Sequence, residues 1–95
     1  MIIVYCQDKT TCDIREIDGS LESMQKLVDG FIQPVYLSSG LCVIVNEEGL
    51  LRGMPFNRFV AGQPLYGPLF FIRTVGADFA GIPYKTAVEL LKLVG

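Results

Sequence analysis

The chain has 95 residues, of which 51% are hydrophobic, and its ten acidic and eight basic side chains leave a formal net charge of −2. Such a length is typical of one domain, and so weak a charge excludes both the basic face of a nucleic-acid binder and the acidic runs of a DNA mimic. Because the chain contains no histidine, imidazole bases, Ser-His or Cys-His nucleophile pairs and histidine metal ligands are excluded, and we expect no enzymatic activity and no cofactor.

The first third of the chain predicts a hairpin followed by a helix. Residues 2–7 are apolar at successive positions, as in a strand covered on both faces, and residues 12–17 are its more polar hairpin partner. Asp18 or Ser20 caps a helix whose apolar side chains recur at helical spacing. The Asp29-Gly30 pair ends this helix, because glycine tolerates the left-handed conformation. The apolar stripe of the helix comprises Leu21, Met24, Leu27 and Val28.

The middle of the chain predicts three further strands. Residues 31–37 form the first, and Pro34 places it at a sheet edge or a bulge, because proline lacks a backbone donor. Residues 41–46 have the strongest strand pattern in the chain. A type I turn over residues 46–49, with its glycine in the left-handed position, leads to a short strand over residues 50–52.

The remaining chain predicts one more buried strand between two irregular segments. Residues 55–60 begin a helical turn with proline in its first position. Residues 61–68 form a Gly/Pro loop, the longest break in regular structure. Residues 69–75 are a buried strand, and residues 76–83 are a loop.

A capping box formed by Thr86 and Glu89 starts the C-terminal helix. The apolar face of this helix comprises Ala87, Leu90, Leu91 and Val94. Five or six short strands with two helices indicate one α+β domain over residues 1–95, with a mostly antiparallel sheet. The mean hydropathy of +0.42 is high for so small a domain, so we expect apolar surface that is covered in a homo-oligomer.

The three cysteines, Cys6, Cys12 and Cys42, are predicted to be reduced and mostly buried. Cys6 and Cys12 could face each other across the first hairpin, although nothing in the sequence requires a disulfide. Three separated cysteines cannot complete a four-cysteine zinc site, so we expect no metal. The N-terminal residues lack the basic region of a secretion signal, and no apolar run approaches the ~20 residues of a membrane helix. We therefore expect a cytoplasmic protein without a membrane partner.

Two segments of the chain resemble a known family. Residues 16–30 and 41–58, the latter with Asn-Glu-Glu-Gly at 46–49 and Gly-x-Pro-x-Asn-Arg at 53–58, resemble the domain of unknown function family 3846. The resemblance extends through Gly67-Pro68 and the Gly-x-Asp loop at 76–78. It implies a small domain of phages, plasmids and mobile elements, which occurs alone or beside counter-defence domains. The family has no established catalytic residues, so none are transferred.

Asn57 and Arg58 are the first candidates for a ligand contact. Asparagine offers a donor and an acceptor, and arginine offers a planar fork for phosphate or carboxylate. The structural alternative is that Asn57 bonds the loop backbone while Arg58 pairs with Glu47 or Glu48. These two acids are expected to be solvated turn residues rather than a paired-carboxylate site, because neighbours in a turn point apart.

A second candidate lies near the end of the last buried strand. Arg73 and Thr74, with Asp78 in the following loop, could bind a phosphate or a ribose, whereas the structural alternative is an Arg73–Asp78 ion pair. Aromatic side chains nearby could stack on a base, but without a basic groove they indicate a core or an oligomer interface. These aromatic residues are Tyr66, Phe70, Phe71 and Phe79.

We therefore expect a non-enzymatic accessory protein of a phage or mobile element that binds and sequesters a small anionic ligand, such as a host nucleotide immune signal. The predicted ligand-binding residues are Arg52, Asn57, Arg58, Tyr66, Arg73, Thr74 and Asp78. The alternative is a protein–protein inhibitor or accessory module that acts on a host enzyme, because tyrosine, phenylalanine and arginine are also enriched at protein interfaces.

Overall fold

Six strands form the main sheet of the computed structural model, which describes residues 1–94. Five of them follow the order β2-β1-β7-β4-β3, and β8 pairs with the last residues of β7. Within residues 1–94, all pairings between these strands are antiparallel. The strands are β1 (Ile2–Cys6), β2 (Cys12–Glu16), β3 (Ile32–Tyr36), β4 (Leu41–Asn46), β7 (Leu69–Val75) and β8 (Asp78–Ala80).

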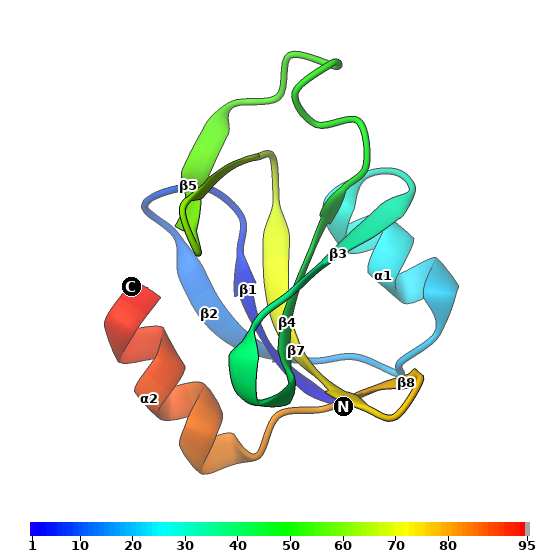
Figure 1. The fold of residues 1–95 in the computed structure, drawn as a ribbon, viewed down its shortest axis with the longest axis vertical. Coiled ribbons are helices and arrows are strands. Elements are labelled where there is room, and N and C mark those ends of the chain that lie inside the picture. Colours follow the sequence, from blue (N-terminus) through cyan, green and yellow to red (C-terminus); the bar gives the residue numbers. More distant parts are fainter. Residues whose placement is uncertain (95) are drawn as a thin grey trace.

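The two faces of this sheet are covered by different elements (Figure 1). The helix α1 (Leu21–Val28) packs on one face. The other face carries the helix α2 (Tyr84–Val94) and a two-stranded hairpin made of β5 (Phe56–Val60) and β6 (Gln63–Tyr66). Because successive strand side chains point to opposite faces, the inner strands supply two separate apolar cores.

The core on the α2 face includes Val4, Cys6, Val43, Val45, Leu69 and Phe71. The core on the α1 face includes Ile3, Tyr5, Cys42, Ile44, Phe70 and Ile72. These cores explain why β1, β4 and β7 are apolar at successive positions, and they confirm the predicted α+β class and the predicted mostly antiparallel sheet. They also confirm that Phe70 and Phe71 belong to the core rather than to a stacking surface. Pro34 lies on β3, an edge strand as predicted.

The predicted helical turn over residues 55–60 and the predicted loop over residues 61–68 are wrong, because these residues form the β5–β6 hairpin. Its turn is Ala61-Gly62, and both residues have positive φ, at 51° and 80°. Two consecutive left-handed residues match the twist of a tight hairpin. The aromatic and β-branched residues of β5 therefore outweigh the helix-start signal of the preceding proline.

The predicted strand over residues 50–52 is also wrong. The chain there coils into a turn, in which the Arg52 amide donates to the Glu48 carbonyl oxygen at 2.8 Å and the Met54 amide donates to that of Gly49 at 2.9 Å. Gly49 was expected to be left-handed, but the glycine with positive φ in this turn is Gly53, at 69°. Gly49 is required for another reason, since a Cβ there would lie 2.5 Å from the Tyr66 carbonyl oxygen.

The ends of the two helices differ in detail from the sequence prediction. The N-cap of α1 is Ser20, as expected, and its hydroxyl accepts a hydrogen bond from the Ser23 amide at 3.1 Å. At the other end, Asp29 itself adopts the left-handed conformation, with a φ of 60°. The helix α2 begins at Tyr84, so Thr86 lies inside the first turn instead of capping it. The predicted loop 76–83 contains β8, which pairs back onto β7.

Candidate functional site

The predicted ligand-binding residues do not form one site. Asn57 and Arg58 are on β5, Arg52 is in the turn after β4 and contacts the end of α1, and Arg73 and Thr74 are on β7, where Arg73 borders a pocket beside the start of α2. The reason is topological, because the strands that carry these residues face different elements. Each location therefore has to be judged by its own contacts.

Asn57 is buried, with 2% of its surface exposed. Its Nδ2 donates to the carbonyl oxygens of Cys6, at 3.0 Å, and Gly67, at 2.9 Å. Its Oδ1 accepts from Arg58 Nε at 2.8 Å. Both ends of the amide are thus used within the protein, as the structural alternative required, and the side chain joins β5 to β1 and to the residue that follows β6.

Arg58 is also engaged inside the protein. Its Nη1 donates to the Val94 carbonyl oxygen at 2.6 Å, and its Nη2 donates to the Asp8 carbonyl oxygen at 3.2 Å and to Cys12 Sγ at 3.1 Å. The proposed pairing with Glu47 or Glu48 is not formed among the described residues. The guanidinium connects the first hairpin turn, β5 and the end of α2, and it presents no open fork to a ligand.

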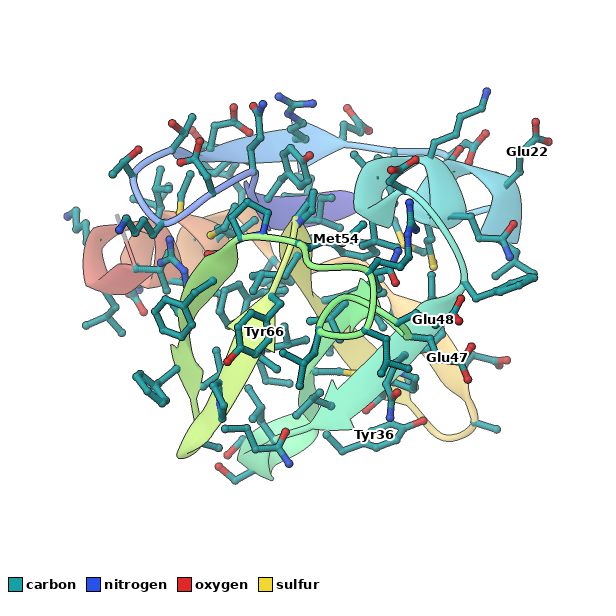
Figure 2. The ribbon with its side chains drawn as sticks, turned by 90° about the horizontal axis from the view of Figure 1, so that it is seen from above. Glu22, Tyr36, Glu47, Glu48, Met54 and Tyr66 are labelled. Carbon is teal, nitrogen blue, oxygen red and sulfur yellow. The ribbon has the colours of Figure 1, made fainter. Side chains whose placement is uncertain are left out.

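The two acids of the turn, Glu47 and Glu48, are exposed as predicted. Figure 2 shows their side chains pointing outward from the turn that separates β4 from β5. They form no salt bridge in the described part of the chain. They act as solvated charges beside an apolar segment.

Arg52 binds the C-terminal end of α1. Its Nη1 donates to the Asp29 carbonyl oxygen at 2.6 Å, and its Nη2 lies 3.3 Å from Asp29 Oδ2. Asn46, which was not among the predicted ligand-binding residues, donates from Nδ2 to the carbonyl oxygens of Val28, at 2.9 Å, and Asp29, at 3.0 Å. Helix ends leave carbonyl groups without partners, so these two side chains cap α1 from β4 and its following turn.

Arg73 is the one predicted arginine whose terminal nitrogens donate no hydrogen bond within residues 1–94. Its Nε donates to the Gly81 carbonyl oxygen at 3.1 Å, which fixes the base of the side chain while leaving the end open. Thr74 uses its hydroxyl on the Gly40 carbonyl oxygen at 3.2 Å. The alternative Arg73–Asp78 ion pair is not formed within this part of the chain. Asp78 lies opposite Val75 at the tip of the β7–β8 hairpin.

Arg73 borders a pocket of about 440 Å³, which we call the Arg73 pocket. Three hydroxyl side chains and three apolar side chains complete its lining: Ser38, Ser39, Thr86, Leu41, Ile82 and Pro83. The hydroxyls come from the β3–β4 connection and from the first turn of α2. The pocket therefore combines one cation, several small donors and an apolar wall, and no acidic side chain lines it.

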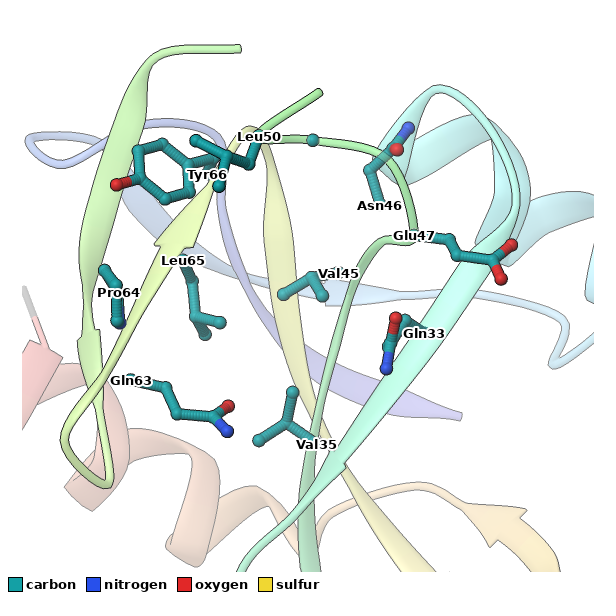
Figure 3. Close-up of a pocket in the computed structure, with 11 residues that line it drawn as sticks. Gln33, Val35, Val45, Asn46, Glu47, Leu50, Gln63, Pro64, Leu65 and Tyr66 are labelled. Carbon is teal, nitrogen blue, oxygen red and sulfur yellow. The ribbon is translucent and has the colours of Figure 1, made fainter. Parts of the chain in front are cut away.

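A second pocket, of about 230 Å³, lies between the β5–β6 hairpin and the strands β3 and β4 (Figure 3). Tyr66, Leu65 and Leu50 form its apolar part, and Gln33 with Gln63 supply amides. Its single charged lining residue is Glu47. No arginine or lysine lines this pocket. Tyr66 is therefore not brought together with any of the predicted arginines.

Three aromatic side chains of the β5–β6 hairpin, which we call the aromatic surface, pack against one another: exposed Phe56 and Phe59, and half-buried Tyr66. The ring centroids of Phe56 and Phe59 lie 5.1 Å apart, and those of Phe56 and Tyr66 lie 5.8 Å apart. Phe59 is 67% exposed, and the neighbouring turn adds Leu50 at 66%. Large apolar side chains gathered in this way are typical of interaction surfaces.

Residues 1–94 contain no group of three His, Cys, Asp or Glu side chains placed to hold a metal ion. Within the same residues, neither helix has the length and apolar character needed to cross a bilayer. The chain matches the model of the family described as a domain of unknown function (DUF3846) over residues 1–95. No curated protein and no solved structure matches it.

Proposed function

This chain belongs to the DUF3846 family of domains of unknown function, and from that premise we propose that it is a non-enzymatic domain that binds and sequesters a small anionic ligand in the Arg73 pocket. A phage or mobile-element origin, a role in counter-defence and a cytoplasmic location are parts of this proposal. A host nucleotide signal is the ligand class that we favour, because it combines anionic phosphates with a planar apolar base.

The observation that supports the proposal is the state of the Arg73 guanidinium. Its Nε is held by the Gly81 carbonyl oxygen, and its terminal nitrogens stay available beside the pocket. A guanidinium held at its base loses less conformational entropy when it binds a phosphate. Arg58 and Arg52, by contrast, already use their terminal nitrogens on carbonyl oxygens of the chain.

The rest of the pocket fits the other parts of such a ligand. The hydroxyls of Ser38, Ser39 and Thr86 can donate to phosphate oxygens or accept from a ribose. Leu41 and Ile82 offer an apolar wall for a base, as ligand pockets commonly do. No carboxylate lines this pocket, so an anion meets no like charge within it.

The experiment is a calorimetric titration of the purified protein with a panel of nucleotides and cyclic nucleotides. Arg73→Gln removes a charge-assisted hydrogen bond of ~1.5–3 kcal/mol, so it should weaken binding about ten- to hundredfold. Arg52→Gln is the matched control, since it removes the same charge at the far end of α1. Equal binding by wild type and Arg73→Gln would overturn the assignment of the pocket.

The same titration tests the absence of turnover. After incubation, the protein is denatured and the nucleotides are analysed by chromatography. We expect every nucleotide to be recovered intact, because the chain has no histidine to act as a general base. A product whose amount scales with protein concentration would refute a purely binding role.

The aromatic surface supports a second candidate, a protein–protein inhibitor or accessory module that acts on a host enzyme. Aromatic residues dominate the energetics of protein interfaces, and this hairpin exposes Phe56 and Phe59, with Tyr66 packed against Phe56. The expected homo-oligomer would use the same surface. Light scattering should then give a mass above the 10.5 kDa of one chain, and Phe59→Ser should return it to that value. A monomeric wild-type protein would contradict the homo-oligomer.

A further inference from the structure

Cys6 and Cys12 are directly opposite each other in the β1–β2 hairpin. Two backbone hydrogen bonds show whether these paired positions are hydrogen-bonded to each other. The Gln7 amide donates to the Thr11 carbonyl oxygen, and the Ile17 amide donates to that of Met1. Paired positions in an antiparallel ladder alternate between hydrogen-bonded and non-hydrogen-bonded. Since Cys6 precedes Gln7 by one residue, the two cysteines occupy a non-hydrogen-bonded pair.

This type of pair brings side chains closest together. Its Cα atoms lie about 4.5 Å apart, against about 5.5 Å in a hydrogen-bonded pair. A disulfide accepts Cα separations of about 4.4–6.8 Å. The backbone of the first hairpin therefore permits a bond between the two sulfur atoms without a change of register.

The environments of the two thiols differ. Cys6 is fully buried in the core on the α2 face, whereas Cys12 is partly exposed at the edge strand. Burial, followed by the contact with Cys12, raises the pKa of the Cys6 thiol to about 12, although the nearby charge of Arg58 acts in the opposite direction. Of the two residues, Cys12 is the more exposed.

Arg58 gives Cys12 a second distinguishing feature. Its Nη2 donates to Cys12 Sγ at 3.1 Å, and the other guanidinium contacts hold it there. These contacts fix the position of the Cys12 sulfur in the hairpin, opposite Cys6. The third cysteine, Cys42, lies in the core on the opposite face of the sheet and cannot take part in this pair.

We propose that Cys6 and Cys12 form an oxidation site, in which hydrogen peroxide converts the two thiols into an intramolecular cross-strand disulfide. The Cys12 thiolate attacks one peroxide oxygen, the O–O bond breaks, and the products are a sulfenic acid and a hydroxide that takes up a proton to give water. The Cys6 sulfur then attacks the Cys12 sulfur, and the leaving hydroxide accepts the Cys6 proton to form a second water. Overall, two thiols are oxidised, one hydrogen peroxide is reduced, and Cys6 acts as the resolving thiol.

The test uses the full chain, reduced and then treated with hydrogen peroxide at a molar equivalent. Remaining thiols are alkylated in denaturant, and the intact mass is measured. We expect one alkyl group in place of three, since three cysteines are free in the untreated protein. Trypsin cleaves after Lys9, between the two cysteines, so the disulfide should join peptide 1–9 to peptide 10–15. Treatment with a dithiol should separate these peptides.

Two variants and one condition make the result specific. Cys42→Ser should give the same linked peptides, whereas Cys12→Ser should leave Cys6 unoxidised because the attacking sulfur is missing. In denaturant, the wild-type chain should form mixed pairings that include Cys42, which shows that the selective pairing needs the fold. The proposal is overturned if the folded wild-type chain yields only intermolecular disulfides, only overoxidised Cys12, or no reaction at all.

Discussion

Arg58 on β5 donates a hydrogen bond from Nη1 to the Val94 carbonyl oxygen at 2.6 Å, and so connects the last turn of α2 to the β5–β6 hairpin. The terminal carbonyls of a helix carry a partial negative charge, which a cation stabilises. The same guanidinium contacts the Asp8 carbonyl oxygen. One side chain thus connects two segments that lie at opposite ends of the sequence, and this connection makes several outcomes testable.

Arg58→Ala should lower the stability of the protein. Loss of its charge-assisted hydrogen bonds costs ~1.5–3 kcal/mol, and each kcal/mol corresponds to ~4–8 °C of Tm in a domain of this size. Arg73→Ala is the matched control, because Arg73 is exposed and only its Nε is bonded within the described residues. Thermal unfolding without ligand should separate the two variants clearly. Equal values of Tm would contradict a structural role for Arg58.

Asn57→Asp should be strongly destabilising although it preserves the shape of the side chain. The carboxylate has no donor for the carbonyl oxygens of Cys6 and Gly67, which would then be buried without a partner at ~1–3 kcal/mol each. Gln63→Glu makes the same chemical change at an exposed position of β6. Urea unfolding should show a large decrease in the free energy of unfolding for Asn57→Asp and a small decrease for the control Gln63→Glu. A small loss at Asn57 would refute the structural assignment.

Gly49 and Gly53 should respond differently to substitution, because each position requires glycine for a different reason. A Cβ at Gly49 meets the Tyr66 carbonyl oxygen at 2.5 Å, whereas a Cβ at Gly53 has nothing within 4 Å but must tolerate a φ of 69°. Alanine should therefore harm both, with ~1–2 kcal/mol of backbone strain at Gly53. Asparagine, which visits the left-handed region more readily, should be tolerated at Gly53 and not at Gly49. Tolerance of asparagine at Gly49 in thermal unfolding would contradict the steric explanation.

Asp18 should contribute to stability against acid. Hydrogen bonds from the Ser20 amide and the Ser23 hydroxyl, with a smaller effect of the N-terminal charge, lower its pKa from 3.8 to about 2. A folded-state pKa below the unfolded one stabilises the protein above pH 3.8, and this contribution is lost as the pH falls towards 2. Asp18→Asn should therefore flatten the stability profile between these values.

The matched control for Asp18 is Glu89→Gln, which removes one carboxylate at an exposed position of α2. Stability should be measured by urea unfolding at several pH values in this range. The difference between the two variants isolates the hydrogen bonds from the change in net charge. An unchanged slope in Asp18→Asn would show that the contacts at the start of α1 do not hold the carboxylate in its charged form.

Local sequence patterns were sufficient to predict much of the secondary structure. The apolar runs of β1, β4 and β7 indicated strands covered on both faces, and Pro34 indicated an edge, because a strand interior needs the amide that proline lacks. Ser20 predicted the start of α1 through its hydroxyl. These features depend on a few neighbouring residues, so the sequence carried enough information about them.

The region between β4 and β7 was mispredicted because competing local signals are nearly balanced there. Pro55 favours a helix start, while Phe56, Phe59 and Val60 favour a strand. The hairpin forms because β5 pairs with β6 and both strands pack against the α2 face of the main sheet. The coiled turn before it exists because Gly49 must pass close to the Tyr66 backbone, a contact between distant parts of the chain.

The roles of the polar residues were likewise decided by the tertiary structure. The sequence identified Asn57, Arg58 and Arg73 as the polar residues of interest, since polar side chains are scarce in an apolar chain. It could not separate the two that satisfy internal carbonyl groups from the one that borders a pocket. That distinction depends on which backbone groups lose their water when distant segments pack together, and only the folded chain brings Cys6, Gly67 and Val94 to the side chains that bind them.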